Sequence, residues 1–208
     1  MEKKSEDDKS GKLHKVFLTQ RLFAYFIDTL IVLLIASLLA SPFVNSNKIS
    51  NLEDKYFSLI NDYTSNKIDD SQFNTDIVNV GYDLAVQNGM MTIINVIVGV
   101  LYFVVLQVKM GGQTLGKKIV NIKVISTDGD LNYNQMIFRS FIANSILLDI
   151  ITVLLLIFSS RNTYFTGVIM FTSIQYLITF ISLITILSSK RGLAVHDKLV
   201  HTRVVRLK

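Results

Sequence analysis

The 208-residue chain contains no cysteine and a single proline, Pro42. Without cysteine it can form neither a disulfide framework nor a zinc or iron–sulfur site with thiolate ligands. Charge is also scarce, because Asp, Glu, Lys and Arg make up 18% of the residues, compared with about 25% in soluble domains. Half of the residues are apolar. Together these features place the chain among integral membrane proteins.

Four apolar runs are long enough to cross a bilayer as helices, since about 20 residues at about 1.5 Å per residue span the hydrocarbon core. They cover residues 20–41, 90–108, 136–158 and 165–187. We therefore predict an all-α membrane protein built as a four-transmembrane-helix bundle. A positively charged flank precedes the first run, as in a signal peptide. Its length, its internal aspartate and the three later runs favour a retained helix.

We place the membrane domain at residues 20–208, with a polar segment before it and another inserted within it. Residues 1–19 form a polar tail, and residues 42–89 form an acidic insert with seven acids and three lysines. Apolar residues recur at helical spacing in the insert, which predicts two amphipathic helices with a break near 64–70, the second capped by Asp70 or Ser71. We interpret the insert as a helical hairpin that packs on itself, in preference to a ligand-binding lid.

Positive charge predicts the orientation in the membrane. The tail and Arg21 hold six Lys or Arg, the loop 109–139 holds five, and the segment after the fourth run holds six; the other two connections share four. Positively charged flanks stay inside, so we expect both termini in the cytoplasm, the insert outside, and a multi-pass protein of the cell membrane. The net charge of +5 is then explained by these flanks, and we expect no nucleic-acid partner.

The loop between the second and third runs contains GGQTLGKK, residues 111–118, which nearly matches a phosphate-binding loop. Lys118 stands where that motif needs a hydroxyl for magnesium, and no buried strand precedes it, so nucleotide binding is not favoured. We expect a short helical turn over 114–118 at the headgroup level, with its lysines reaching lipid. The alternating segment 120–126 should pair as a strand with 202–207 in a small cytoplasmic two-stranded sheet.

The first run carries an unusual acid, Asp28. Arg21, Tyr25 and Asp28 share one helical face at positions i, i+4 and i+7. A carboxylate at this depth costs on the order of 3 kcal/mol at insertion, so it needs a partner, a proton or water. It is either a structural hydrogen-bonding group or an ion or proton site.

A second acid, Asp149, lies in the third run and shares a face with Ser145 and Thr152. Arg139, ten residues earlier, is on another face and should not be its partner. Asn95 faces inward from the second run. A polar line follows one face of the fourth run, consisting of Thr172, Gln175, Thr179 and Ser182. Such lines are common in helix packing, but facing two carboxylates they could line a wetted cavity.

Near the end of the chain, His196, Asp197 and His201 invite comparison with a metal site. Their spacing is poor for one helical face and no other histidine lies nearby in sequence, so we expect no metal and no cofactor. We expect residues 193–200 to form a short interfacial helix.

Several motifs of the chain resemble those of the RDD family of small polytopic membrane proteins, which is named for one arginine and two aspartates. Arg21 and Asp28 match the arginine and the first aspartate, and GGQTLGKKIVNIKVISTDG is similar to the glycine-marked loop of the family. HDKLVHTRVV is similar to its closing motif, with the second aspartate at Asp197. The resemblance implies a cytoplasmic loop and transport of an unidentified ligand, or exchange of cations and protons.

Our first hypothesis is a small secondary transporter that exchanges protons or monovalent cations through buried aspartates. The alternative is a non-transporting scaffold or accessory subunit that binds a protein or anionic lipid. No nucleophile with a base is present, so we do not expect an enzyme. Besides the bilayer, a homodimer is an assembly that the sequence allows. The candidate ion-binding residues are Arg21, Tyr25, Asp28, Asn95 and Asp149, with Arg139 and Asp197 for gating or structure and Ser145, Thr152, Thr172, Gln175 and Thr179 as polar lining.

Overall fold

The computed structural model describes residues 16–189 and 192–207. The first helix, α1, covers Leu18–Ala40 and passes into a 3₁₀ turn, Ser41–Phe43, with Pro42 at its beginning. Proline suits the first turn of a helical segment because it has no backbone N–H to donate. The predicted first span is therefore present, with its end near the proline.

The acidic insert forms a hairpin of two helices, as predicted, but its second helix does not end before the membrane. Helix α2 covers Ser46–Thr64 and helix α3 covers Asp70–Val100. The predicted second amphipathic helix and the predicted second span are thus one continuous helix, because no proline separates them and Gly89, at the boundary, lies within α3. The cap also differs from the prediction, since Asp69 accepts the backbone N–H of Gln72 at 2.7 Å.

Helix α3 continues through a π-helical segment, η3 at Leu101–Leu106, into a short helix α4 at Gln107–Lys109. A π-helical turn inserts extra backbone into an α-helix and frees a carbonyl from its usual partner. Here the hydroxyl of Ser140 donates to the carbonyl oxygen of Phe103 at 3.1 Å. The irregular turn therefore joins the second span to the third.

The third span is broken, and our prediction of one helix over 136–158 was wrong. Helix α6 covers Tyr133–Ala143, helix α7 covers Ile146–Phe158, and they meet at an angle of 71°. Between them Ser145 adopts a left-handed conformation with φ of 56°. Local sequence did not reveal this because the run contains no proline, and polar residues such as Asn144 and Ser145 also occur inside straight membrane helices.

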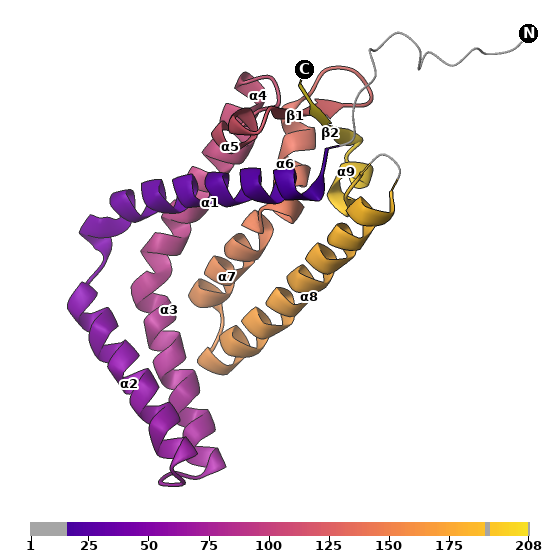
Figure 1. Cartoon of the computed structure of the whole chain (residues 1–208). Coiled ribbons are helices and arrows are strands. Elements are labelled where there is room, and N and C mark those ends of the chain that lie inside the picture. Colours follow the sequence, from indigo (N-terminus) through magenta and orange to yellow (C-terminus); the bar gives the residue numbers. More distant parts are fainter. Residues whose placement is uncertain (1–15, 190–191, 208) are drawn as a thin grey trace, which may run out of the picture.

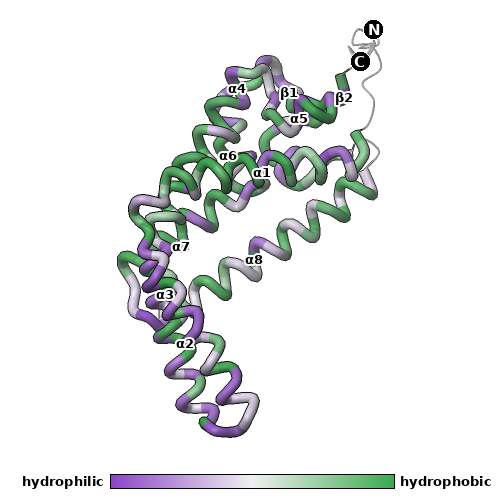
Figure 2. Tube along the Cα trace, turned by 60° about the vertical axis from the view of Figure 1, so that its left-hand side comes forward, coloured by the Kyte–Doolittle hydropathy of each residue, from purple (hydrophilic) through white to green (hydrophobic). Residues whose placement is uncertain are grey.

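Helix α8, Arg161–Ser188, is the last long helix. In the described part of the chain, α1, α3 and α8 are long and apolar enough to cross a membrane, and α6 with α7 adds a fourth span if the bent pair counts as one. Figure 2 shows long hydrophobic stretches on α1 and α8 and a more hydrophilic α2. The predicted membrane class and largely helical fold are confirmed.

A small antiparallel sheet lies at the end of the bundle opposite the α2–α3 hairpin, and we call this the sheet end (Figure 1). Strand β1, Ile122–Ser126, pairs with β2, Thr202–Arg206, as the sequence predicted. Short helices α5, Leu115–Ile119, and α9, Val195–Leu199, precede the two strands. Apolar residues from the sheet, α1 and the residues before it, η3 and α6 share one core, consisting of Val16, Ala24, Val104, Ile122, Val124, Met136 and Val204.

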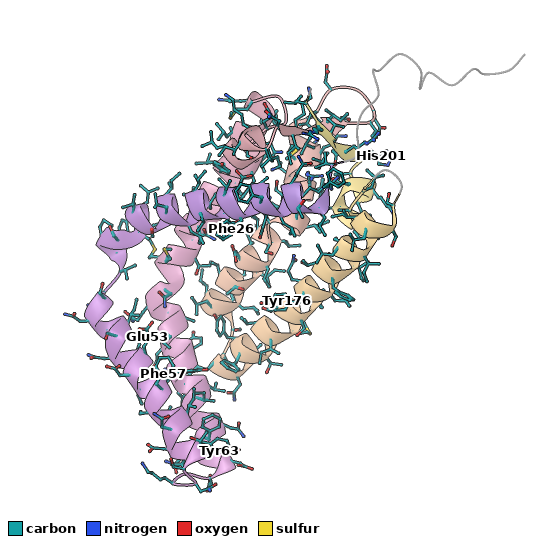
Figure 3. The ribbon with its side chains drawn as sticks, in the orientation of Figure 1. Phe26, Glu53, Phe57, Tyr63, Tyr176 and His201 are labelled. Atoms are coloured by element: carbon teal, nitrogen blue, oxygen red, sulfur yellow. The ribbon has the colours of Figure 1, made fainter. Side chains whose placement is uncertain are left out.

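At the opposite end, the α2–α3 hairpin extends beyond the other helices, with Tyr63 near its tip (Figure 3). Arg161, at the start of α8, bonds the side chain of Asn79 at 3.0 Å and pairs with Asp83 at 3.1 Å, both on α3. The hydroxyl of Tyr82 donates to the carbonyl of Leu156 on α7 at 3.2 Å. Polar contacts thus fix α3, α7 and α8 together near the hairpin.

Candidate functional site

A buried ion-pair cluster lies at the sheet end, around Asp197 of α9. One carboxylate oxygen accepts from Arg21 at 3.0 Å, and the other accepts from Arg139. Arg139 also donates to the hydroxyl of Thr202 on β2, and the backbone N–H of Ala194 donates to Asp197 at 3.0 Å. The Asp197 side chain is fully buried. We call this cluster the Asp197 clamp, because it fastens α9 and the sheet to α1 and α6.

Asp28, seven residues after Arg21 on α1, binds a different set of groups. It accepts the hydroxyl of Tyr102 and the backbone N–H of Gly116, each at 2.7 Å, and also the hydroxyl of Thr114. The Lys117 ammonium lies 3.7 Å away. Its carboxylate is therefore satisfied by protein groups, most of them from one loop and α5. Asp28 docks that loop on the membrane helix.

Close approach of α5 to α1 makes this docking possible. A Cβ atom at Gly116 would lie 2.4 Å from the carbonyl oxygen of Ala24 and 2.8 Å from Asp28 Oδ1. Gly112, at a φ of 91°, is equally constrained, because a Cβ there would lie 1.9 Å from the carbonyl oxygen of Val124. Gly112 and Gly116 of this loop thus have a packing role.

Lys117 does not reach out to lipid, as we had expected for the lysines of this turn. Its side chain is 16% exposed and points to Asp28. Burial lowers the pKa of Lys117 to about 8, although the Asp28 carboxylate opposes this shift. At neutral pH the ammonium remains mostly charged and pairs with Asp28.

A cavity of about 220 Å³ lies beside both clusters. Its charged walls are Arg21 and Asp28 from α1, Lys117 from α5 and Arg139 from α6. Uncharged polar side chains and one histidine complete the lining: Gln107, Ser140, Asn144, Ser145, Thr179, Ser182 and His196. We call this space the large cavity. It brings together charged residues from both halves of the chain.

Asp149 lines a second, smaller cavity of about 60 Å³ with Asn95, Thr29 and Gly99. The amide nitrogen of Asn95 donates to Asp149 at 3.1 Å, and the Asn95 carbonyl oxygen is buried without a hydrogen-bond partner among the described residues. We call this space the small cavity. Tyr25, Phe103 and Asn144 line both cavities, so the two are neighbours.

A model of the RDD family matches residues 16–201, which is most of the chain and includes Arg21, Asp28 and Asp197. The chain belongs to the RDD family. Curated proteins and solved structures gave no match. Arg21 and Asp197, which the sequence matched to the family's arginine and second aspartate, are direct partners in this RDD protein, whereas Asp28 binds the central loop.

The predicted site residues divide between these clusters. Arg21, Arg139 and Asp197 form the clamp, in which Asp197 pairs with both arginines. Asp28 and Asp149, expected to face one interior, line different cavities. Tyr25, 45% exposed, lies between them. Of the predicted polar lining, Ser145 and Thr179 line the large cavity, Gln175 donates to the backbone carbonyl of Ile142, and Thr152 and Thr172 are half-buried elsewhere.

Sequence reasoning missed most of the partners of Asp28. Thr114, Gly116 and Lys117 are far from Asp28 in sequence, and their pattern suggested an interfacial turn. One signal was available, because a buried carboxylate requires donors and this loop is rich in small and hydroxyl residues. Tyr102, which also donates to Asp28, was not among the predicted site residues.

Acid should weaken this RDD protein through His196. Burial, followed by the charge of Arg139, lowers the pKa of His196 to about 3. The unfolded chain protonates this histidine near pH 6.5, so it binds more protons than the folded protein, and stability falls as pH drops below about 6.5. Asp197 adds to this at lower pH, since the arginines outweigh its burial and hold its pKa below the usual range.

We therefore expect the thermal midpoint in detergent to fall between pH 7.5 and 5, and the His196→Gln variant to show a flatter profile. His201→Gln is the matched control, because the His201 side chain is 63% exposed and pairs with Asp128. Circular dichroism melts at several pH values measure both. Equal slopes for wild type and His196→Gln would contradict the assignment.

Proposed function

We propose that this RDD-family protein is a small secondary transporter that exchanges protons or monovalent cations, and that Asp149 and Asn95 form its ion site. One observation carries the proposal: a carboxylate and an unpartnered amide oxygen face the same small cavity next to a broken membrane helix. Both groups are oxygen acceptors, as a proton or an alkali cation requires. Ionisable groups at this depth commonly mark ion pathways.

The size of the small cavity suits such an ion. A water molecule needs about 10–15 Å³ of this kind of space, so about 60 Å³ accommodates an ion with a water. Asp149 has one described hydrogen bond, to Asn95, whereas Asp28 has three. In this proposal Asp149 exchanges the ion, and Asp28 holds the loop. Discontinuous helices form the ion sites of other transporters in the same way.

The orientation and the inner gate are part of the same proposal. The positively charged segments 109–139 and 192–207 meet at the sheet end. We place that end and both termini in the cytoplasm of a cell, and the α2–α3 hairpin outside. The Asp197 clamp would then hold the cytoplasmic side of the large cavity closed. This proposal assigns no enzymatic activity to the protein.

Flux in proteoliposomes tests the proposal. Purified protein is reconstituted with a pH-sensitive dye inside the vesicles, and pulses of sodium, potassium or lithium are applied outside. We expect cation-dependent proton movement for wild type and its loss for Asp149→Asn. Asn95→Ala, which removes the amide ligand, should raise the half-saturating cation concentration about tenfold, equivalent to about 1.4 kcal/mol.

Asp83→Asn is the matched control, since Asp83 is an acid on α3 whose side chain is 44% exposed and lines neither the large nor the small cavity. It should transport like wild type. The proposal fails if wild type moves no protons above empty vesicles with any of the three cations, or if folded Asp149→Asn retains full flux.

Two observations favour a second candidate, a non-transporting scaffold or accessory subunit. The carboxylate of Asp28 is fully occupied by structural contacts, and the hairpin presents exposed aromatic residues such as Phe57. This role would be supported if the protein shows no flux and a second protein co-purifies with it in stoichiometric amount. That second protein should be lost when residues 46–64 of the hairpin are replaced by a short linker.

A further inference from the structure

The large cavity contains buried hydrogen-bonding groups that the described protein does not satisfy. Two nitrogens of Arg21, Nε and Nη2, have no partner among the described residues, although its side chain is only 10% exposed. The hydroxyl of Ser182 on α8 and Nδ1 of His196 on α9 are also buried and unpartnered. All three side chains line the large cavity. Buried polar groups in this state are rare and call for a ligand or water.

The free edge of Arg21 has the geometry of an anion receptor. Its Nη1 donates to Asp197 at 3.0 Å, which leaves Nε and Nη2 as two parallel donors on another edge of the guanidinium group. Such a pair binds two oxygens of a carboxylate or phosphate at once. The Ser182 hydroxyl adds a donor from another helix.

Charge around the large cavity also favours an anion. Arg21 and Arg139 share a single carboxylate, Asp197, while Lys117 is paired with Asp28. The clamp and its surroundings therefore carry one more positive than negative charge, with His196 neutral. Arg203 on β2 interacts electrostatically with Arg21 and adds to this excess. An unbalanced charge in a buried site is costly, and a bound anion would remove that cost.

The helix break supplies a further favourable group. Ser145, at the N-cap of the 13-residue helix α7, makes no side-chain capping bond, and it lines the large cavity with Asn144. The first N–H groups of a helix are unpaired and carry partial positive charge, so they favour anions. In broken membrane helices such termini point at anionic substrate groups.

We propose that the large cavity binds an oxyanion, a carboxylate or a phosphate, held by Arg21 and Ser182 beside the Asp197 clamp. This goes beyond the cation exchange proposed above and uses the other cavity. At about 220 Å³ the space is smaller than a drug-sized pocket of about 300–1,000 Å³, so it suits a small solute or a headgroup. Leu22, Leu183 and Ile186 form an apolar wall between α1 and α8, which an acyl chain could also contact.

Equilibrium binding to the full-length protein in detergent tests this. One arm titrates inorganic phosphate or acetate against sodium chloride of equal ionic strength, and the other adds phosphatidylglycerol against phosphatidylcholine. Calorimetry gives the affinity for the soluble anions, and the thermal midpoint reports stabilisation in both arms. A response to phosphate or acetate identifies a soluble anion. A response to phosphatidylglycerol with none to phosphatidylcholine identifies a lipid headgroup.

Ser182→Ala should weaken binding about 5- to 10-fold, the loss of one hydrogen bond of about 1 kcal/mol or slightly more. Arg21→Lys, which removes the bidentate edge, should weaken it at least about tenfold. Ser173→Ala is the matched control, because this exposed serine of α8 bonds its own helix; it should bind like wild type.

The proposal is overturned if phosphate, acetate and phosphatidylglycerol all leave the midpoint unchanged relative to their controls. It is equally overturned if folded Ser182→Ala binds the anion like wild type. This test remains valid if Arg21→Lys fails to fold. Asp149→Asn should bind the anion like wild type, because Asp149 lines the small cavity. The binding measurement therefore tests this proposal independently of the flux measurement.

Discussion

Replacing Asp197 with asparagine should lower the free energy of unfolding by about 3–5 kcal/mol, the usual consequence of removing one partner from a buried ion pair. The carboxylate is fully buried and is the shared counter-ion of Arg21 and Arg139. An amide at this position would leave both guanidinium groups without a counter-ion and would turn an NH₂ group toward one of them. Three segments of the chain would lose their common attachment.

For a protein of this size the change corresponds to a decrease of about 10 °C in Tm. Thermal melts of purified protein in one detergent measure it. Asp128→Asn is the matched control, because Asp128 also pairs with a basic residue, His201, at 2.7 Å, but its side chain is 58% exposed. Exposed pairs contribute about 0–1 kcal/mol. If both variants melt at the same temperature, the clamp does not stabilise the fold.

Gly116→Ala should detach the central loop from α1. Its new methyl group would lie 2.4 Å from the carbonyl oxygen of Ala24 and 2.8 Å from Asp28 Oδ1. Both distances are shorter than the contacts that Cβ atoms make with non-bonded atoms, and the backbone oxygen cannot rotate away. Helix α5 must retreat, which breaks the bond from the Gly116 N–H to Asp28. Overpacking costs about 1–3 kcal/mol, and the weakened bonding of a buried carboxylate adds about 1–3 kcal/mol.

The detachment can be measured directly at Lys117, whose side chain is 16% exposed in the docked loop. We expect faster trypsin cleavage there and faster amide exchange across 114–119. Gly99→Ala is the control, because it also places a methyl group on a helix, but its nearest neighbour is Ile146 at 3.7 Å, an ordinary contact. Equal cleavage of the two variants would show that α5 does not need its close approach to α1.

Several features could be predicted from the sequence because they depend on neighbouring residues. The pairing of 120–126 with 202–207 followed from alternation in two segments that flank the membrane runs, and it is present in β1 and β2. The break near 64–70 was also visible, since it is polar and short. The exact cap, Asp69, was missed by one residue, because Asp69, Asp70 and Ser71 are all good capping residues.

The errors share a cause, which is that local pattern does not report angles between segments. A run such as 136–158 reads as one helix whether it is straight or bent by 71°, because its hydrophobicity is the same. Likewise the amphipathic and membrane parts of α3 have different compositions but the same backbone. The change in composition suggested a helix boundary at a point where the backbone hydrogen bonds of α3 continue without a break.

The sequence by itself determined that this is a membrane protein of the RDD family, with a helical hairpin, a small sheet and two acids at membrane depth. Apolar length, charge and motif spacing are properties of contiguous residues, so they can be read without a fold. Only the tertiary structure decided which groups those acids meet. Asp28 receives its donors from residues more than 70 positions away, and Asp197 finds Arg21 across 176. Such partners are chosen by how the segments pack.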